Sequence, residues 1–546
     1  MKNFDIDTEK HRKILFNILD EISKEKDWNE SSLQKILRKY PKNGKQMFRK
    51  DELVAAYTTL LKRSDDTVEE RIRMKPTRTN SGVATVTVLT KPYPCPGKCI
   101  YCPNDANMPK SYISSEPGAQ RALSNKFNPY AQVFNRLVAL NNVGHNIEKV
   151  ELIVLGGTWN FYIEQYRLSF IYECFRALND VRKDTTEYID PESTSLTIVT
   201  WEDLEKVQKE NENAYCRNVG LVVETRPDYI SEEEVIHMRR LGCTKVQIGI
   251  QSLSNKVLKK NDIGRTRQDT QRAFEILRRM GFKIHGHWMP NLYGSSVKKD
   301  IADYKKLWSK KFSPDELKIY PTSIIENTKL HELYLKDIYK PYTDEELEYV
   351  LKRILPLTPR YCRLTRIIRD IPAGDIVAGN KRSNLRQIVE MSLKKDGIFV
   401  EDIRNREIKG ESIDLKDLVL ERIEYETTVS KEIFLSYNTK VSDKICGFLR
   451  LSLPKKKYKR KHFLKEIEGC SLIREVHVYG KVLGIKDRSS GESQHLGLGK
   501  KLIGIAEEIS KDYGFEKISV ISAIGTREYY RKRGFSDGEL YMEKKL

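Results

Sequence analysis

The sequence contains no long apolar run. Across its 546 residues, no stretch of 18 or more residues is apolar, so we predict that the chain does not span a membrane. The first residues, MKNFDIDTEKHRK, lack the apolar segment of a signal peptide. We therefore expect a protein that stays inside the cell, in the cytoplasm.

Cysteine is scarce. The chain has nine cysteines, an odd number, and only Cys95, Cys99 and Cys102 lie close together in the sequence. Such a set does not make a disulfide framework. It indicates a reducing compartment and a metal ion or metal cluster at the three clustered thiols.

Acidic residues are outnumbered. The chain has 97 Lys and Arg against 77 Asp and Glu, a net charge of +20. An excess of this size favours a polyanionic partner such as nucleic acid. A general abundance of lysine explains the charge equally well, so charge alone indicates a class of partner and no chemistry.

The length predicts two to four domains, and the pattern changes along the chain. Residues 1–75 read as a small, basic helical region that is a candidate for RNA contact. Residues 76–321 alternate six short β-branched runs with helical segments, which predicts a parallel sheet, either doubly wound or rolled into a partial barrel. We assign residues 322–420 to a connecting subdomain and 421–546 to a second α/β domain.

The three cysteines follow the first predicted strand in the segment KPYPCPGKCIYCPN. In barrels, chemistry gathers at this end of the strands. Three thiolates can hold three irons of a [4Fe–4S] cluster and leave the fourth iron open to S-adenosylmethionine. The spacing C-x3-C-x2-C, with Tyr101 before the last cysteine, resembles the radical S-adenosylmethionine superfamily. The alternative is a zinc site completed by a distant histidine.

Further polar and glycine residues end the next strands. Gly156, Gly157 and Thr158 resemble the turn that meets the methionyl amino group in this superfamily, and glycines permit a close backbone approach. Glu224 ends the third strand, and Gln247 and Gln251 flank the fourth; these side chains suit the ribose and carboxylate of S-adenosylmethionine. His285 and His287 end the fifth strand, and we expect at most one of them to face the site.

The C-terminal region carries a second motif. The segment with Gln494, Gly497, Leu498, Gly499 and Lys500 enters a predicted helix, whose free N–H groups and dipole favour anions. With the preceding strand IREVHVYG, it resembles the acetyl-CoA pyrophosphate loop of GCN5-related (GNAT) acetyltransferases. The segment GTREYYRKRGF resembles that family's next motif, in which a tyrosine lies near the thioester. Tyr530 is the candidate, with Tyr529 beside it.

The two motif sets together resemble the family of Elongator catalytic subunits, which are tRNA wobble-uridine acetyltransferases. The resemblance runs from about residue 75 to the C-terminus through TKPYPCPGKCIYCPN, KVELIVLGGTW, VVETRPD, VQIGIQS, IREVHVYG, QHLGLGK and GTREYYRKRGF. The short cysteine spacing is similar to that of archaeal and bacterial members. The resemblance implies an α/β multidomain fold: a partial (β/α)6 TIM-like barrel, a GNAT-type domain and a small helical N-terminal region.

The resemblance also implies a reaction, carboxymethylation at C5 of the wobble uridine in the anticodon stem-loop of tRNA. A 5′-deoxyadenosyl radical takes hydrogen from the methyl group of acetyl-CoA, the carbon radical adds to C5, and water releases CoA. The cofactors would be a [4Fe–4S] cluster and S-adenosylmethionine, with acetyl-CoA as co-substrate. An external electron donor is required. Other Elongator subunits are not implied, and the chain is compatible with a monomer or a homodimer.

Residue roles carry over from the family position by position. Cys95, Cys99 and Cys102 would hold the cluster, and Lys149 matches a lysine that contacts acetyl-CoA. The acetyl-CoA site would contain Glu475, Val476, His477, Val478, Leu498, Gly499, Lys500 and Tyr530, with Glu475, His477 and Tyr530 as the catalytic candidates. The sequence departs from the family pattern at Arg265, where the family often has histidine. Arginine keeps a positive charge there, but a role in proton transfer at this position is in doubt.

Two other functions fit parts of the sequence. A protein lysine acetyltransferase with a structural iron–sulfur domain would use the GNAT motif, but gives no reason for an intact C-x3-C-x2-C. A tRNA-docking protein with inactive domains would explain the charge, but not the complete set of ligand-type residues. For tRNA contact, the sequence favours the N-terminal helices and the basic segment PKKKYKRKHFLK (454–465).

Overall fold

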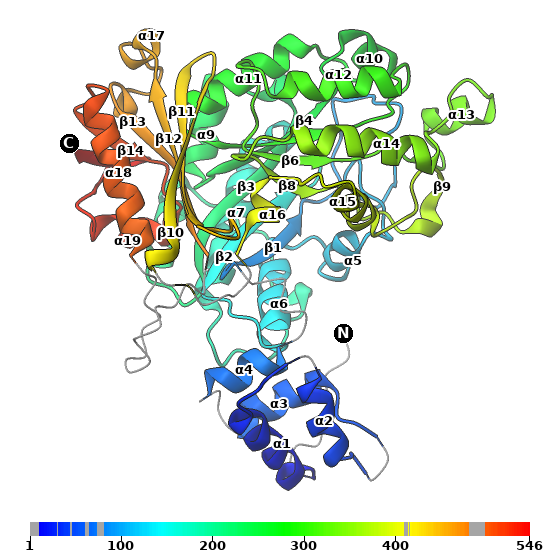
Figure 1. Ribbon diagram of the computed structural model, residues 1–546, viewed down its shortest axis with the longest axis vertical. Helices are drawn as coiled ribbons and strands as arrows, with labels where there is room; N and C mark the ends of the chain where they lie inside the picture. The colour runs from blue at the N-terminus through cyan, green and yellow to red at the C-terminus, as the bar shows by residue number, and fades with distance from the viewer. Residues whose placement is uncertain are drawn as a thin grey trace.

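The computed structural model describes residues 10–29, 31–43, 46–60, 65–73, 81–408, 413, 415–479 and 497–546. Its N-terminal unit contains α1 (Arg12–Lys24), α2 (Ser32–Lys39), α3 (Lys50–Leu60) and α4 (Asp66–Ile72). The apolar positions of α1 recur every three or four residues, so Leu15, Ile18, Leu19 and Ile22 share one buried face. These helices enclose a core of their own and lie at one end of the molecule (Figure 1).

A seven-stranded parallel sheet forms the centre, in the order β1-β2-β3-β4-β5-β6-β8. The strands are β1 (Ala84–Leu89), β2 (Lys149–Leu155), β3 (Arg217–Thr225), β4 (Lys245–Gln251), β5 (Lys283–Trp288), β6 (Glu316–Ile319) and β8 (Arg363–Arg366). The sheet curls into a half-barrel (Figure 1), which confirms the expected fold class. Its first six strands coincide with the six β-branched runs. The seventh, β8, comes from the segment expected to connect the domains.

Helices cover the outer face of this sheet. The principal ones are α5 (Pro117–Ser124), α6 (Pro129–Asn141), α7 (Glu164–Asp180), α8 (Trp201–Asn211), α9 (Glu232–Arg240), α10 (Asn255–Lys260), α11 (Arg267–Arg279), α12 (Val297–Leu307) and α14 (Asp344–Ile354). In β2, Val150, Leu152 and Val154 are buried, whereas Glu151 and Ile153 line an internal cavity. This alternation follows from the two-residue period of a strand. The concave face is therefore free to form a site.

The C-terminal domain is a second seven-stranded sheet, in the order β10-β11-β12-β13-β14-β16-β15. Its strands are β10 (Leu418–Glu426), β11 (Ser430–Thr439), β12 (Ile445–Pro454), β13 (Ser471–Val478), β14 (Lys517–Val520), β15 (Ser536–Asp537) and β16 (Met542–Lys545). Helices α18 (Leu498–Asp512) and α19 (Arg527–Arg531) belong to it. The strands pair antiparallel except β13 with β14, which are parallel. Leu502, Ala506 and Ile509 of α18 pack against the sheet.

A buried ionic contact joins the two sheets. Arg474 of β13 donates from Nη1 to Asp315 Oδ1 at 3.0 Å and to Glu432 Oε2 at 2.7 Å, and it also donates to the backbone of Phe282 at 2.9 Å. Arg474 and Asp315 are fully buried. Burying charges without partners is costly, so the contact stabilises the docked arrangement only because each charge is paired.

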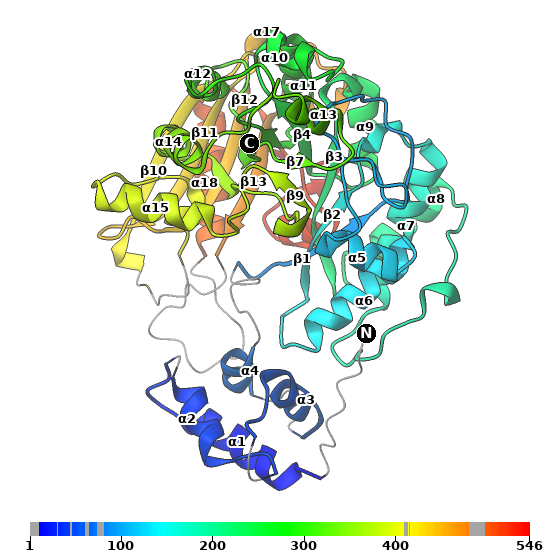
Figure 2. The ribbon, with the colours of Figure 1, turned by 90° about the vertical axis from the view of Figure 1, so that its right-hand side faces the viewer.

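Smaller elements lie between the sheets and at the rim. They are β7 (Ile324–Ile325), β9 (Ile376–Ala378), α13 (Lys329–Leu335), α15 (Leu385–Lys395), α16 (Ile403–Arg406) and α17 (Lys456–Lys459). Helix α17 carries the basic segment and lies at the opposite end of the molecule from the N-terminal unit (Figure 1). After a quarter turn, α4 lies below the half-barrel and nearer to it than α1 and α2 (Figure 2). None of the described helices is long and apolar enough to cross a membrane.

Candidate active site

The cysteine loop lies directly after β1. Cys95, Cys99 and Cys102 are free, half-buried thiols. The loop closes by a hydrogen bond from the Cys102 N–H to Cys99 O at 3.2 Å. Among the described residues, no three His, Cys, Asp or Glu side chains converge as they do around a single metal ion. Each thiolate of a [4Fe–4S] cluster binds a different iron, so a cluster does not require that convergence.

The glycine turn after β2 contacts this loop. Gly156 and Gly157 have φ of +136° and +94°, which favours glycine. A Cβ at Gly156 would collide with Thr90 Oγ1, so the close approach of the turn to β1 also requires glycine. Thr158 Oγ1 lies 4.0 Å from Cys95 Sγ. The turn predicted to meet S-adenosylmethionine is therefore next to the cysteines.

Polar side chains of β3, β4, β5 and β6 form a hydrogen-bonded group. Gln247 Oε1 accepts hydrogen bonds from His287 Nε2 at 3.0 Å and from Lys318 Nζ at 2.6 Å. Glu224 Oε2 accepts a hydrogen bond from the hydroxyl of Tyr112 at 2.8 Å. His287 Nδ1 lies 3.7 Å from Glu224 Oε1. Glu224 and Gln247 thus line the same cavity.

The expectation for the two histidines of β5 is wrong. His285 and His287 both line the cavity, with ring centroids 5.6 Å apart. They are two residues apart, and side chains at that spacing point to the same face of a strand. Burial lowers the pKa of both imidazoles well below the usual range, so both rings are neutral at physiological pH.

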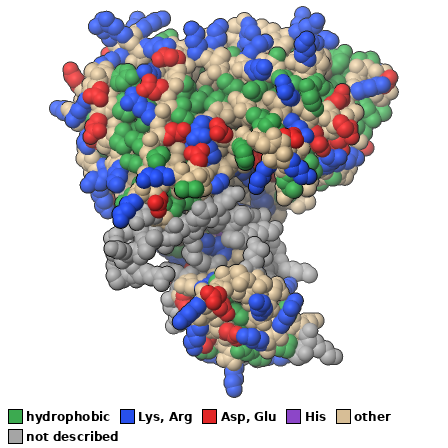
Figure 3. Space-filling model, in the orientation of Figure 1, with side chains coloured by type: hydrophobic (Ala, Val, Ile, Leu, Met, Phe, Trp, Pro, Cys, Tyr) green, Lys and Arg blue, Asp and Glu red, His purple; other side chains and the backbone are tan. Residues whose placement is uncertain are grey.

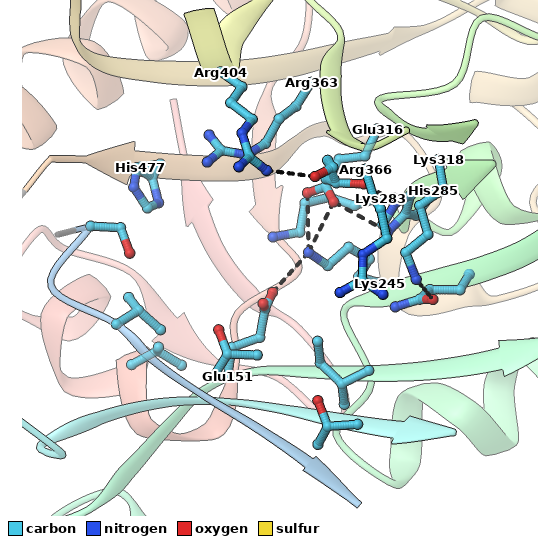
Figure 4. A pocket seen from close by; sticks show the side chains of 18 of the residues that line it. Glu151, Lys245, Lys283, His285, Glu316, Lys318, Arg363, Arg366, Arg404 and His477 are labelled. Atoms are coloured by element: carbon cyan, nitrogen blue, oxygen red, sulfur yellow. Dashed lines mark hydrogen bonds and ion pairs between the residues drawn. The ribbon is translucent and has the colours of Figure 1, made fainter. Parts of the chain in front are cut away.

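Sequence reasoning missed a group of charged residues inside the half-barrel. Lys245 Nζ lies 2.8 Å from Glu151 Oε1 and 3.0 Å from Glu316 Oε1. Figure 4 shows Lys283, Lys318 and His285 around the same point. Burial opposes charge on Glu316, but Lys245 and its neighbours hold the pKa of that carboxyl at about 2. The available signal was polar and charged residues at alternate positions of two strands, Lys245 and Gln247 in one and Glu316 and Lys318 in the other.

In the C-terminal domain, β13 and β14 separate after three residues. Only Ser471, Leu472 and Ile473 of β13 pair with β14, and the rest of β13 continues without it. That part contains Glu475, Val476, His477 and Val478, which line the cavity. The edge of β13 opposite β12 is therefore open to an extended ligand.

Helix α18 begins close to this open edge. Gly497 is its N-cap residue, with a φ of +66°, and Leu498, Gly499 and Lys500 form the first turn. The N–H groups of a first helical turn have no partner within the helix and favour an anion. A Cβ at Gly499 would collide with the hydroxyl of Tyr529 and lie 3.7 Å from Val478. Gln494 lies outside the described residues.

Glu475 and His477 differ in protonation and in partners. Glu475 Oε1 lies 3.1 Å from Lys283 Nζ, and its Oε2 lies 2.9 Å from Arg450 Nε. Burial opposes its ionisation, but Lys283 and Arg450 lower its pKa to about 2. Burial lowers the pKa of His477 to about 4. Nε2 of His477 is buried and has no hydrogen-bond partner among the described residues.

The remaining predicted residues line the same space. Tyr530 is buried and packs edge-on against Tyr529, with ring centroids 5.3 Å apart. Burial raises the pKa of its hydroxyl, which therefore stays protonated. Lys149 begins β2 and is paired in register with Arg217 of β3. Burial and the charge of Arg217 lower the pKa of Lys149.

One cavity of about 2260 Å³ is lined by residues of both the half-barrel and the C-terminal domain, and it reaches Tyr101, the neighbour of Cys102. Tyr101, Tyr112 and Gln251 line it at the cysteine end, and Val476, Gly499 and Tyr530 line it at the other end. His477 faces the labelled lysines and carboxylates across this space (Figure 4). The half-barrel and the C-terminal domain therefore share one cavity, although the sequence separates their motifs by about 400 residues.

Comparison with known proteins identifies relatives that align with most of the chain. The radical SAM superfamily matches residues 93–299, and the Radical_SAM C-terminal domain matches 314–395. The chain is 40% identical over 491 residues to a tRNA uridine(34) acetyltransferase of Methanocaldococcus jannaschii, covering 87% of this chain and 86% of that protein. Elongator complex protein 3 of Saccharomyces cerevisiae is 35% identical over 495 residues, covering 87% and 85%. The structure of archaeal Methanocaldococcus infernus Elp3, with an N-terminal deletion, has a TM-score of 0.71 at 36% identity, covering 85% and 99%.

Proposed function

Since the chain belongs to the family of tRNA uridine(34) acetyltransferases and Elongator complex protein 3, we propose that it is a transferase that modifies the wobble uridine of tRNA. It adds a carboxymethyl group to C5 of that uridine, with acetyl-CoA as the carbon source and S-adenosylmethionine as the radical source. The observation that carries this proposal is the single cavity between the cysteine loop and the C-terminal domain. A reaction between two bound cofactors requires such a connection.

The residues at the cysteine end fit a [4Fe–4S] cluster. Three thiols in one loop are the donor set for three irons, and the radical SAM domain implies both the cluster and S-adenosylmethionine. When bound, these two groups supply a 5′-deoxyadenosyl radical that can take hydrogen from a methyl group. Gly156 and Gly157 let the backbone approach the methionyl group, and Glu224 and Gln247 offer acceptors to its polar atoms.

The residues at the other end fit acetyl-CoA. The first turn of α18, with Leu498, Gly499 and Lys500, binds the pyrophosphate through free N–H groups. The open edge of β13 takes the pantetheine arm and directs the thioester toward the half-barrel. Lys149, at the start of β2, lies on the wall that faces this arm.

His477 is the group that accepts a proton when water releases CoA. Its imidazole is neutral at physiological pH, and its buried Nε2 is free to accept a hydrogen bond from water. Glu475 is a weak base because its pKa is about 2, and it instead holds Lys283 and Arg450 in place. Tyr530 keeps its proton and can donate a hydrogen bond to the thioester oxygen.

Arginines at the cavity rim support tRNA as the substrate. Arg363 and Arg404 lie together in the upper part of Figure 4, Arg366 lies nearer to Glu316 and Lys283, and Arg386 also lines the cavity. An anticodon base can enter such a site without leaving a duplex, while its phosphates contact the rim. Elsewhere, Lys and Arg side chains are spread over the face shown in Figure 3 and form no single patch there.

The complete reaction tests the proposal. The reconstituted protein is incubated with tRNA, acetyl-CoA, S-adenosylmethionine and dithionite, and the tRNA nucleosides are then analysed by mass spectrometry. We expect 5-carboxymethyluridine, and none when S-adenosylmethionine is omitted or when Cys99 is replaced by Ala. No modified nucleoside from a protein with a full cluster contradicts the proposal. Acetylation of a peptide that survives in Cys99→Ala would instead indicate a lysine acetyltransferase.

A further inference from the structure

Two arginines lie beside the cysteine loop, and the function proposed above gives them no role. Arg226 follows β3. A Cβ placed on Gly97, between Cys95 and Cys99, would collide with Arg226 Nη1 and lie 3.6 Å from Cys95 Sγ. The guanidinium of Arg226 therefore packs against the backbone of the loop, close to the first thiol.

Arg265 is the second arginine, at the position where the family often has histidine. Only 2% of its side chain is exposed. Its Nη1 donates to Thr270 Oγ1 at 3.1 Å, while Nε is buried and has no hydrogen-bond partner among the described residues. Burial lowers the pKa of Arg265 to about 10, so the side chain still carries its charge at neutral pH.

The two arginines share one acidic residue. Asp228 lies 2.8 Å from Arg226 Nη2 and 3.9 Å from Arg265 Nε. Two positive charges thus face one negative charge beside the cysteines. The contact of Arg226 with Gly97, whose Cβ position lies 3.6 Å from Cys95 Sγ, places one of these positive charges close to a thiol of the loop.

Backbone contacts fix this arrangement. The N–H of Ile100 donates to Asn261 O at 3.1 Å, and Arg226 Nη2 donates to Ile263 O at 3.0 Å. The segment from Asn261 to Arg265 therefore runs along the cysteine loop and holds Arg265 at a set place relative to it. Fixed charges of this kind cost no reorganisation when the charge of a neighbouring group changes.

We propose that Arg226 and Arg265 raise the reduction potential of the cluster. The proposal rests on the binding of a [4Fe–4S] cluster by Cys95, Cys99 and Cys102. One electron from an external low-potential donor makes the cluster one charge more negative, and no bond forms or breaks in that step. A fixed cation nearby stabilises the reduced state more than the oxidised state. The pair thereby lets a weaker reductant serve as the donor.

A redox titration of the whole reconstituted protein tests this inference. The reduced cluster is followed by electron paramagnetic resonance as the solution potential is lowered with dithionite and mediators. We expect a lower midpoint potential in Arg226→Gln and Arg265→Gln, and the lowest in the double variant. Arg265→Lys keeps the charge and should stay close to the parent. Arg240→Gln, which removes an exposed arginine paired with Glu205, is the matched control and should leave the potential unchanged.

The Arg265→His variant gives an independent measurement. Histidine loses its charge as pH rises, so we expect its potential to fall with increasing pH more steeply than that of the parent. Iron content and the resonance spectrum report whether the cluster is bound, which separates failure of the proposed function from failure of this inference. Unchanged potentials in the Gln variants overturn the proposal. If those variants lose their iron, an unaltered pH slope in Arg265→His overturns it.

Discussion

Lys283 Nζ and Glu475 Oε1 lie 3.1 Å apart and join the half-barrel to the C-terminal domain inside the shared cavity. Arg450 holds the second carboxylate oxygen of Glu475 at 2.9 Å. Glu475→Gln would remove the carboxylate that pairs with Lys283 and would leave the buried Arg450 only Asp315, 3.6 Å away, as a counter-charge. We expect a loss of about 3 kcal/mol in unfolding free energy, measured by chemical denaturation at neutral pH.

The control for this experiment is an exposed pair. Glu205 lies 2.8 Å from Arg240, and both side chains are substantially exposed. Exposed ion pairs contribute about 0 to 1 kcal/mol, so Glu205→Gln should change the unfolding free energy by less than that. Equal effects of the two substitutions would contradict the assignment of Glu475 to the domain contact.

The ionisation of the Glu475 carboxyl predicts that stability depends on pH. The pKa of Glu475 is about 2 in the folded protein, below its value of about 4.5 when unfolded. A carboxyl whose pKa is lower in the folded than in the unfolded protein stabilises the fold at pH values above its unfolded pKa. That stabilisation is lost as pH falls from about 4.5 toward 2. We therefore expect the difference in unfolding free energy between the parent and Glu475→Gln to shrink across this window. A difference that stays constant from pH 7 to pH 3 would count against the ion pair.

Gly499 and Gly504 form a matched pair of tests on α18. A Cβ at Gly499 would collide with the Tyr529 hydroxyl, whereas a Cβ at Gly504 meets nothing within 4 Å. Gly499→Ala should displace Tyr529 from the start of the helix and weaken acetyl-CoA binding about tenfold or more by calorimetry. Gly504→Ala should leave binding unchanged and stabilise the helix by about 1 kcal/mol. Equal affinities of the two variants would remove this turn from the proposed pyrophosphate site.

His477 predicts the pH profile of CoA release. As a proton acceptor with a pKa of about 4, it is fully neutral from pH 6 to 8, so the hydrolysis rate should be flat there and fall near pH 4. His477→Gln should reduce CoA release by about 10²- to 10⁴-fold, measured as free thiol, while acetyl-CoA still binds. A variant that hydrolyses acetyl-CoA at the parent rate would exclude this role.

Sequence alone predicted the parts of the fold that have strong local signals. Each of the first six parallel strands is a β-branched run bounded by turn residues, so its position follows from periodicity. The strand β8 was missed because its four residues, RLTR, include two arginines and no apolar run. Likewise β10 lies at the edge of the second sheet, and four of its nine residues, LVLERIEYE, are charged. Such strands are set by pairing with a neighbour rather than by their own composition.

The candidate site also contains residues that the sequence could predict and residues that it could not. The cysteines and the glycine turns could be found because their chemistry requires particular residues at fixed spacing. Lys245 and Glu316 could not, because each is an ordinary charged residue until the sheet brings the two within 3.0 Å. The roles predicted for single residues stay predictions, whereas one cavity lined by Glu224, Gln247, His477 and Tyr530 is a property of the structure.

The rim arginines and the basic segment of α17 give different predictions for tRNA binding. Arg366 and Arg404 line the cavity, whereas Lys456 and Lys457 lie on α17, at the end of the molecule away from the N-terminal unit (Figure 1). If the rim holds anticodon phosphates, Arg366→Gln and Arg404→Gln should each weaken tRNA binding and lower the slope of log affinity against log salt by about 1.

The comparison variant is Lys456→Gln with Lys457→Gln, which removes two positive charges from α17. Binding is measured by fluorescence anisotropy of a labelled anticodon stem-loop over a series of salt concentrations. A ligand of that size, bound at the cavity mouth, should not reach α17, so its affinity and salt slope should match the parent. A larger loss in the lysine variant than in the arginine variants would move the tRNA contact to α17. In that case the basic segment PKKKYKRKHFLK, and not the cavity rim, would be the surface that recognises the phosphate backbone.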